Sequence, residues 1–336
     1  MRNRTAITTW RRGGFEQKPR SLVMLLIGAA AMAFCAMPAT VHAQLLVGVG
    51  DDIAEYDAST GTSINSTFIS DSSSAAVSIT QSGSDLFVAY NNGTIEEYTT
   101  SGAVVNASLI TGLNFSSGGG LAVSGSNLFI TQGLAGVVEY GTDGSGGSTP
   151  TFNSNVNDGI GIAASGSTLF IANHVDGYAD GTVGSFDASG TTNNASLVTD
   201  VGDVTPDSVA VSGTTLYIAS DPTTGNVLGN GGGTVTSYST SGTVNGGFTT
   251  ITGVYGPVGI AVSGSDLFVA SYGGTVAEYG TDGSSINASF VTSASSDSAL
   301  WVLEAVPEPS AYAAIFGVLA LGAAIGREMR RRREEA

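Results

Sequence analysis

Basic residues are missing from most of this sequence. All 11 Lys and Arg lie in residues 1–20 or 327–333, whereas residues 44–306 contain none and hold 23 of the 28 Asp and Glu. Binding of DNA or RNA draws most of its affinity from cationic side chains that displace phosphate counterions. Docking on anionic lipid headgroups needs the same charges. The composition therefore argues against nucleic acid and anionic membrane surfaces as partners of this stretch, and leaves divalent cations, neutral glycans and basic proteins.

Cysteine and histidine are almost absent as well. The single cysteine, Cys35, lies in an apolar leader, and His174 is the only histidine beyond residue 43. Residues 44–306 therefore have no disulfide and no thiol. A three-histidine metal site, a Cys/His dyad and a lysine Schiff base are excluded. A Ser-His-Asp triad remains formally open, although no Gly-x-Ser-x-Gly elbow accompanies it.

The first 43 residues have the organisation of a secretory signal peptide. Basic residues precede an apolar run over residues 21–37, and Val41-His42-Ala43 provides small residues for cleavage before Gln44. The general secretory route fits this segment. Arg11-Arg12 also fits a twin-arginine signal, with imperfect spacing, so the export route stays open.

The C-terminus combines three parts. Val306-Pro307-Glu308-Pro309 precedes an apolar segment, residues 311–326, which is followed by a basic cluster of Arg327, Arg330, Arg331, Arg332 and Arg333. This arrangement resembles the PEP-CTERM sorting tail of Gram-negative bacteria, also catalogued as an ice-binding protein C-terminal domain. The resemblance implies cleavage near Pro-Glu-Pro by an exosortase-type membrane enzyme, followed by surface display or release. It does not imply ice binding, and a plain C-terminal anchor is the alternative.

The physical properties of the tail agree with this reading. Sixteen apolar residues span about 24 Å as a helix, somewhat less than the ~30 Å hydrocarbon core. We expect a single transmembrane helix over residues 311–326 that holds the chain only modestly, with the arginines on the cytoplasmic side. Pro307 and Pro309 keep the preceding segment extended, as a processing protease requires.

Residues 44–305 consist of a repeated unit. Each copy contains a Leu-aromatic pair within an apolar run. The pairs begin at Leu86, Leu128, Leu169, Leu216 and Leu267, with spacings of 42, 41, 47 and 51 residues. A Ser-Gly turn precedes each pair, and a segment of the type Gly-Thr-Val-Ala-Glu-Tyr follows it. Four short β segments per unit, separated by turn residues, are typical of a β-propeller blade.

The two ends of the repeat region predict how the ring closes. Residues 45–69 match only the last three strands of a unit, and residues 299–304 supply one strand. We therefore predict an all-β, six-bladed propeller whose sixth blade combines N-terminal strands with one C-terminal strand, which hides the sheet edges. The consecutive apolar residues of Leu-Phe-Val-Ala predict a strand buried on both faces. An open parallel β-solenoid is the alternative, which the uneven spacings fit less well.

The unit from Pro257 to Tyr279 is similar to NHL-type repeats of six-bladed propellers. The similarity extends over most of residues 45–304. It departs from those repeats in lacking the basic residues between the second and third strands, so the RNA binding of some NHL propellers is not implied. Lyase and lactonase-like activities of related scaffolds remain an analogy of fold alone.

Candidate binding residues lie in two long links between second and third strands, residues 173–182 and 221–233. A propeller would place both links on one face. The candidates for binding on this face are His174, Asp176, Asp180 and Asp221. The first three are also the candidates for a metal or acid–base cluster; polar loop residues without a function are the alternative. No cofactor is predicted and the metal is unknown. Ca²⁺ is the open alternative, because aspartates recur near turns although no EF-hand or nonapeptide spacing is present.

Two further sets of polar residues have simpler interpretations. Asp143-Gly and Asp282-Gly are turn formers. Asn-x-Ser/Thr recurs at regular places of the repeat, which predicts strand and turn residues rather than glycan sites, at Asn65, Asn92, Asn106, Asn114, Asn194 and Asn287.

The sequence thus predicts an exported, non-enzymatic propeller of the envelope or extracellular matrix. It would pass through an intermediate anchored in the inner membrane and meet an exosortase-type enzyme, with exopolysaccharide as a further partner. An extracytoplasmic hydrolase or lyase is one alternative, and it would place His174 against two carboxylates on the ring axis. A glycan-binding adhesive module is the other, and it would expose aromatic residues such as Tyr178 and Tyr255.

Overall fold

Twenty-three β-strands make up the described part of the protein, and they form six sheets. The computed structural model describes residues 43–70, 74–115, 118–147, 156, 158–173, 181–199, 204–222, 232–292 and 302–303. All of them belong to one compact unit, His42–Glu308. The predicted signal peptide up to residue 42, the sorting motif, the segment 311–326 and the arginine cluster lie outside the described residues.

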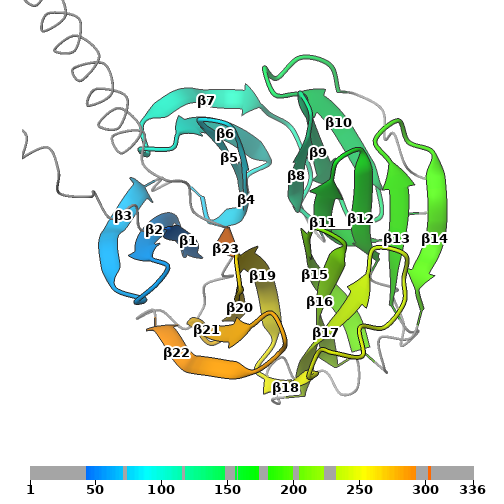
Figure 1. Ribbon diagram of the computed structural model, residues 1–336. Helices are drawn as coiled ribbons and strands as arrows, with labels where there is room; N and C mark the ends of the chain where they lie inside the picture. The colour runs from blue at the N-terminus through cyan, green and yellow to red at the C-terminus, as the bar shows by residue number, and fades with distance from the viewer. Residues whose placement is uncertain are drawn as a thin grey trace, which may run out of the picture. The chain divides into compact units, whose positions relative to one another are not determined.

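Each sheet is one blade of a ring, with its first strand nearest the centre (Figure 1). Blade A consists, from the centre outward, of β23 (Val302–Leu303), β1 (Gln44–Val49), β2 (Asp52–Asp57) and β3 (Ser63–Ser70). Blade B consists of β4 (Ala76–Ser82), β5 (Asp85–Tyr90), β6 (Thr94–Thr99) and β7 (Val104–Ile110). Blade C consists of β8 (Leu121–Ser124), β9 (Asn127–Thr131) and β10 (Val137–Gly141).

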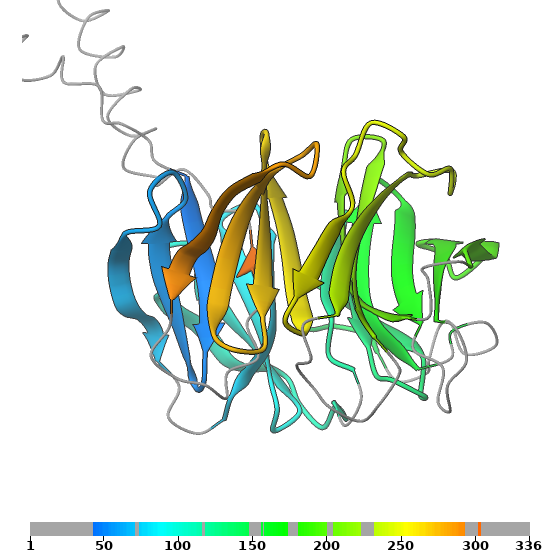
Figure 2. The same ribbon diagram turned by 90° about the horizontal axis from the view of Figure 1, so that it is seen from below.

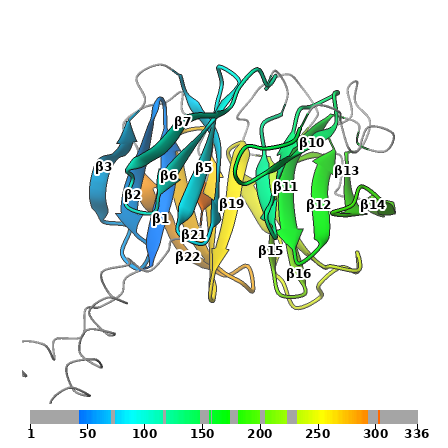
Figure 3. The same ribbon diagram turned by 90° about the horizontal axis from the view of Figure 1, so that it is seen from above.

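The remaining three blades have four strands each. Blade D consists of β11 (Gly159–Ser165), β12 (Thr168–Asn173), β13 (Thr182–Asp187) and β14 (Thr192–Val198). Blade E consists of β15 (Val204–Ser212), β16 (Thr215–Pro222), β17 (Gly233–Ser239) and β18 (Ile251–Val254). Blade F consists of β19 (Pro257–Ser263), β20 (Asp266–Ser271), β21 (Thr275–Gly280) and β22 (Ser285–Thr292). Seen from the side, the strands run between the two ends of the ring (Figures 2 and 3).

The two ends of the repeat region close the ring in the predicted way. β23 pairs antiparallel with β1, so that Leu303 lies opposite Leu46 and Val302 lies opposite Val47. Blade A therefore combines three N-terminal strands with one C-terminal strand, and the prediction of a closed six-bladed propeller is confirmed. The departure from four strands is in blade C. Among the described residues it ends in a single bridge between Tyr140 and Gly146 in place of an outer strand.

Six hydrophobic clusters fill the six interfaces between neighbouring blades. The second strand of each blade contributes to two of them, since side chains alternate along a strand. In blade B, Leu86 and Val88 pack toward blade A, whereas Phe87 and Ala89 pack toward blade C. All four are buried. The consecutive apolar residues of the repeat therefore arise because the second strand is covered on both faces, as predicted.

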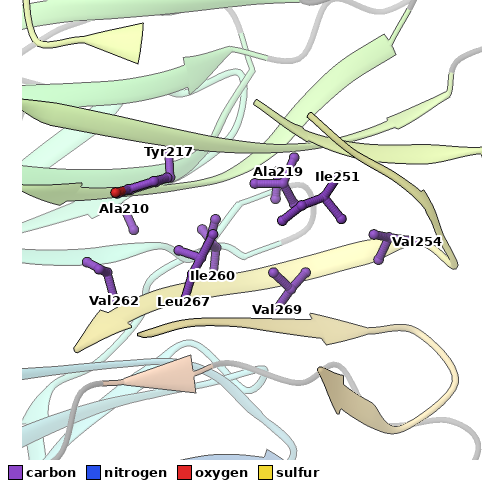
Figure 4. Packing of buried hydrophobic residues seen from close by; sticks show 10 residues of the cluster. Ala210, Tyr217, Ala219, Ile251, Val254, Ile260, Val262, Leu267 and Val269 are labelled. Atoms are coloured by element: carbon purple, nitrogen blue, oxygen red, sulfur yellow. The ribbon is translucent and has the colours of Figure 1, made fainter. Parts of the chain in front are cut away.

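The interface between blades E and F shows this packing closely (Figure 4). Ala219 of β16 and Ile251 of β18 face Ile260 of β19 and Leu267 and Val269 of β20. Each blade buries its apolar face only against its neighbours, so the repeat is stabilised by closing the circle.

The outer strands bend at an asparagine. In β3, β7, β14 and β22 an Asn Oδ1 accepts the backbone N–H two residues further on at 3.1 Å, and the pairing register shifts nearby. Blade E keeps the same bond from Gly247 N to Asn245 Oδ1 (3.2 Å), although Gly replaces Ser or Thr there. The recurring Asn thus shapes the strand, which confirms its interpretation as a strand and turn residue.

Among the residues that the structure describes, there is no helix with the length and apolar character to cross a membrane.

Candidate functional site

The blades differ most at the end of the ring where each second strand leads into the third; we name this the loop end. The first residue after the core of the second strand is Gly50 in blade A, Asn91 in blade B and Gly133 in blade C. Blades E and F have Asp221 and Tyr272 at the same place in the pairing register. Equivalent positions of the blades can therefore be compared with one another. At this position the adjacent blades E and F differ from blades A to C in having an acidic and an aromatic residue.

A second departure from the repeat lies on the innermost strand of blade E. The register of β15 against β16 shifts between Pro206 and Ser208, which leaves Asp207 as the extra residue of a β-bulge. Blades B and F have the same shift, and their bulge residues, Val77 and Val258, pack toward the next blade. Asp207 thus carries a carboxyl group at a place where equivalent residues are apolar and face the neighbouring blade.

Asp207 and Asp221 interact across this bulge. Thr205 lies opposite Asp221 in the β15–β16 pairing, so Asp207 is the diagonal neighbour of Asp221. Burial, and next the negative charge of Asp221, raise the pKa of Asp207 to about 8, while a hydrogen bond from the Asp221 backbone partly offsets this. Burial also raises the pKa of Asp221. Burial and the neighbouring carboxylate thus both favour the neutral form of Asp207.

This pair predicts an opposite pH dependence from that of an ordinary surface aspartate. Because the folded-state pKa of Asp207 exceeds the unfolded value of about 3.9, its contribution to stability is fully present below about pH 4 and is lost as the pH rises through about 8. Between about pH 4 and about pH 9 the parent should lose on the order of 5 kcal/mol relative to Asp207→Asn. Urea unfolding of both chains across this range measures the difference.

Asp282→Asn is the matched control for that experiment. Hydrogen bonds from the Ser284 side chain and backbone lower the pKa of Asp282, so its contribution is present above the unfolded pKa and is lost as the pH falls. Between about pH 4 and about pH 9 the control variant should therefore differ from the parent by a nearly constant amount, and this difference should change only below about pH 4. A parent–Asp207→Asn difference that stays constant with pH would contradict the assignment.

Two exposed tyrosines, one in the connection from blade E to blade F and one after β20 of blade F, lie beside this pair. Tyr255 is 45% exposed and Tyr272 is 39% exposed, and each is followed by a glycine. The N–H of Tyr272 donates to the carbonyl oxygens of Gly256 (2.9 Å) and Tyr255 (3.2 Å). A Cβ placed on Gly273 would lie 3.7 Å from Cδ1 of the Tyr255 ring. The two Tyr-Gly pairs are thus held against each other by the backbone, with both side chains exposed.

Gly256 connects the tyrosines to the carboxyl pair. Its φ is +50°, and a Cβ there would lie 3.1 Å from Tyr272 Cβ and 3.9 Å from Asp221 Oδ2. The connection from blade E to blade F therefore runs between the carboxylate and the second tyrosine. We name the group formed by Asp207, Asp221, Tyr255 and Tyr272 the E–F corner.

The ring axis contains a cavity of about 250 Å³, lined by the first strands of blades B to F. Its polar side chains are those of Ser78, Thr80, Gln81 and Ser208, and none of the described residues that line it is charged. The hydrolase alternative requires His174 and two carboxylates there; His174 lies outside the described residues. Among the described residues, the lining of this cavity is therefore uncharged and mixes polar with apolar groups.

Other carboxyl groups have roles that the repeat explains. Asp143 Oδ1 and Asp282 Oδ1 each accept the N–H of the serine two residues on at 2.9 Å, and Gly144 and Gly283 take φ of +78° and +83°. Their prediction as turn formers is confirmed. Within the described residues, no group of three or more His, Cys, Asp or Glu is placed to hold a metal ion.

The structure brings together only part of the predicted loop-face cluster. Asp221 lies at the E–F corner, whereas His174, Asp176, Asp180 and the aromatic Tyr178 lie outside the described residues. Both long links do fall between second and third strands, after Asn173 and after Pro222. Sequence reasoning missed Asp207 and Tyr272. A position-by-position alignment of the repeats contains the signal, because Asp207 replaces a valine of blades B and F.

Comparison with solved structures supports the fold. A chain of the nidogen/laminin complex is similar to this protein with a TM-score of 0.60 at 12% identity, over 79% of this chain and 99% of that one. The similarity is one of fold. The extracellular domain of a one-component system from B. thetaiotaomicron (TM-score 0.47, 13% identity, 71% of this chain and 30% of that one) is more distant. So is the computationally designed protein Ika8 (0.42, 13%, 74% of each). No family model matches the sequence, and no curated protein matches it.

Proposed function

We propose that this chain is an exported, non-enzymatic β-propeller that a PEP-CTERM tail delivers to the cell surface or the extracellular matrix. An exosortase-type enzyme is its processing partner, after an intermediate anchored in the inner membrane. The propeller would then act as a binding or structural module of the envelope.

The position of the ring within the chain carries this proposal. β1 begins at Gln44, the residue that follows the expected signal cleavage site. β23 ends at Leu303, and the sorting motif begins three residues later at Val306. Both cleavages would therefore fall just outside the first and last strands, so that processing removes every Lys and Arg and leaves the closing pair of β1 and β23 intact.

The charge of the ring supports a location outside the cytoplasm, in contact with uncharged polymers. Without a single Lys or Arg in residues 44–306, the ring repels anionic polymers and stays soluble despite its many β-strands. A hydrolase or lyase is the competing function. The carboxyl pair at the E–F corner has the residue types for acid–base chemistry, which is the observation that favours this alternative.

Mass spectrometry of the protein from its own cells tests the sorting. We expect a mature chain that begins at Gln44 and ends near Pro307–Pro309, without Arg330–Arg333. Replacing Pro307 and Pro309 by Ala should retain the full tail in the inner-membrane fraction, because the segment before the helix would no longer be held extended. Ser310→Ala is the matched control, because Ser310 directly follows the motif. Pro257 does not serve as a control, because it lies within the ring and its replacement would affect folding. A mature surface protein that still contains Arg330–Arg333 would overturn the proposal.

A further inference from the structure

We infer that the E–F corner binds a neutral saccharide chain, with sugar rings against Tyr255 and Tyr272 and sugar hydroxyls bonded to Asp221. The inference rests on the proposed function only in that export brings the ring into contact with extracellular saccharides. Binding itself is a property of the folded ring and can be measured without any sorting.

The tyrosines provide the apolar part of the site. Two adjacent exposed aromatic side chains offer a ligand apolar surface, and its burial on binding removes that surface from water. Tyr255 and Tyr272 come from two different connections of blade F, yet the Tyr272 N–H bonds to the Tyr255 and Gly256 carbonyls fix them side by side. Because the backbone of both residues is already fixed, less conformational entropy is lost when a sugar binds, which favours affinity.

The carboxyl groups provide the polar part. Asp221 Oδ2 and Tyr272 Cβ lie 3.9 Å and 3.1 Å from the position of a Cβ on Gly256, so the carboxylate borders the aromatic surface. Asp207 is diagonal to Asp221 on the same strand pair. The oxygens of the Asp221 carboxylate accept hydrogen bonds, as the hydroxyls of a sugar require. The aromatic surface with a few polar groups at its edge is typical of a small-molecule site.

Charge decides between saccharides and other ligands. An anionic polymer would meet two acidic residues and a ring without cations. A basic peptide is the main competitor. The poly-lysine probe described below separates it from a saccharide. Two exposed tyrosines beside a carboxylate suit a neutral chain with hydroxyl groups, whose apolar faces cover the rings and whose hydroxyls donate to Asp221.

The repeat supplies evidence that the corner is specialised. The residues equivalent to Tyr272 are Gly50, Asn91 and Gly133 in blades A to C, and those equivalent to Asp207 are Val77 and Val258 in blades B and F. A purely structural role would be served by the residues that the other blades use. Gly256, with φ of +50°, holds the connection in a conformation that other residues rarely adopt.

The test measures binding of the full-length chain, in detergent, to the neutral fraction of the extracellular polysaccharide of its own cells. The variants are Tyr255→Ala and Tyr272→Ala, with Leu134→Ala as the matched control, because Leu134 is 65% exposed in the β9–β10 turn at the loop end of blade C. We expect each tyrosine variant to weaken binding about tenfold, the scale of one lost aromatic contact, and Leu134→Ala to leave it unchanged. Thermal unfolding of every variant establishes that the ring is intact.

Three results would overturn the inference. The parent chain is not retained by the neutral polysaccharide; Leu134→Ala weakens binding as much as the tyrosine variants do; or a poly-lysine probe displaces the saccharide and binds more tightly, which identifies a site for basic ligands. None of these results bears on tail cleavage, and failed sorting in cells leaves the binding measurement unaffected. The two proposals can therefore fail separately.

Discussion

A chain of residues 44–299 will not form a stable closed ring, whereas a chain of residues 44–305 will. The shorter chain lacks β23, so that Leu46 and Val47 of β1, both buried in the ring, lose the strand that pairs with them. Uncovering these two side chains and their backbone groups should lower the free energy of unfolding by on the order of 4 kcal/mol. The free edge of β1 should also pair with other chains and cause association.

Urea unfolding and analytical ultracentrifugation of the two chains measure this effect. The longer chain is the matched control, because it differs only in keeping residues 300–305, which contain the closing strand β23. Equal stability and an equally monomeric state for both chains would show that β23 does not close the ring. Adding a synthetic peptide of residues 299–305 to the shorter chain should restore part of the lost stability in proportion to its concentration.

Phe268→Ala should destabilise the ring by about 3–5 kcal/mol, the usual cost of removing a buried aromatic side chain. Phe268 is 1% exposed in the cluster between blades F and A. Its ring centroid lies 5.3 Å from that of Phe290. The cavity left by the substitution would lie at the interface that β1 must join to close the ring. The melting temperature should fall by roughly 10 °C.

Phe268→Leu is the control for size, and it should cost only about 1 kcal/mol because an apolar side chain still fills most of the space. Tyr255→Ala is the control for position; its loss should stay within about 0.5 kcal/mol, as for other exposed residues. Calorimetry of the three variants compares them directly. If Phe268→Ala and Tyr255→Ala were equally stable, the cluster between blades F and A would not be packed as described.

Much of the fold follows from the sequence, because the same pattern of strands and turns recurs in every repeat unit. The Leu-aromatic pairs predict the doubly covered second strand, and five copies of them together with the divided sixth unit predict the closed ring. The Asp143-Gly and Asp282-Gly turns follow from local backbone preferences, which need no knowledge of distant residues. In blade C the repeat is weakest after Tyr140, and there the described strands stop at three.

The candidate site was predictable only in part. Asp221 was identified by its place in a long link, and Tyr255 as an aromatic residue that a glycan binder would expose. Asp207 was missed because it lies within an apolar strand, where its neighbours predict a buried side chain. Tyr272 was missed because a tyrosine after a Leu-Phe-Val-Ala run is equally consistent with a core residue, such as Tyr90 in blade B, which is fully buried.

By itself the sequence determined the number of blades, the strands that close the ring and the separation of charge between the ring and its two ends. These properties depend on local patterns and on composition, which repetition makes unambiguous. Only the tertiary structure decided that Asp207 meets Asp221 and that Tyr255 lies against Tyr272. The bulge in β15 shifts the pairing by one residue and so chooses the face to which Asp207 points. The packing of blade F on blade E then brings two connections together that no sequence spacing relates.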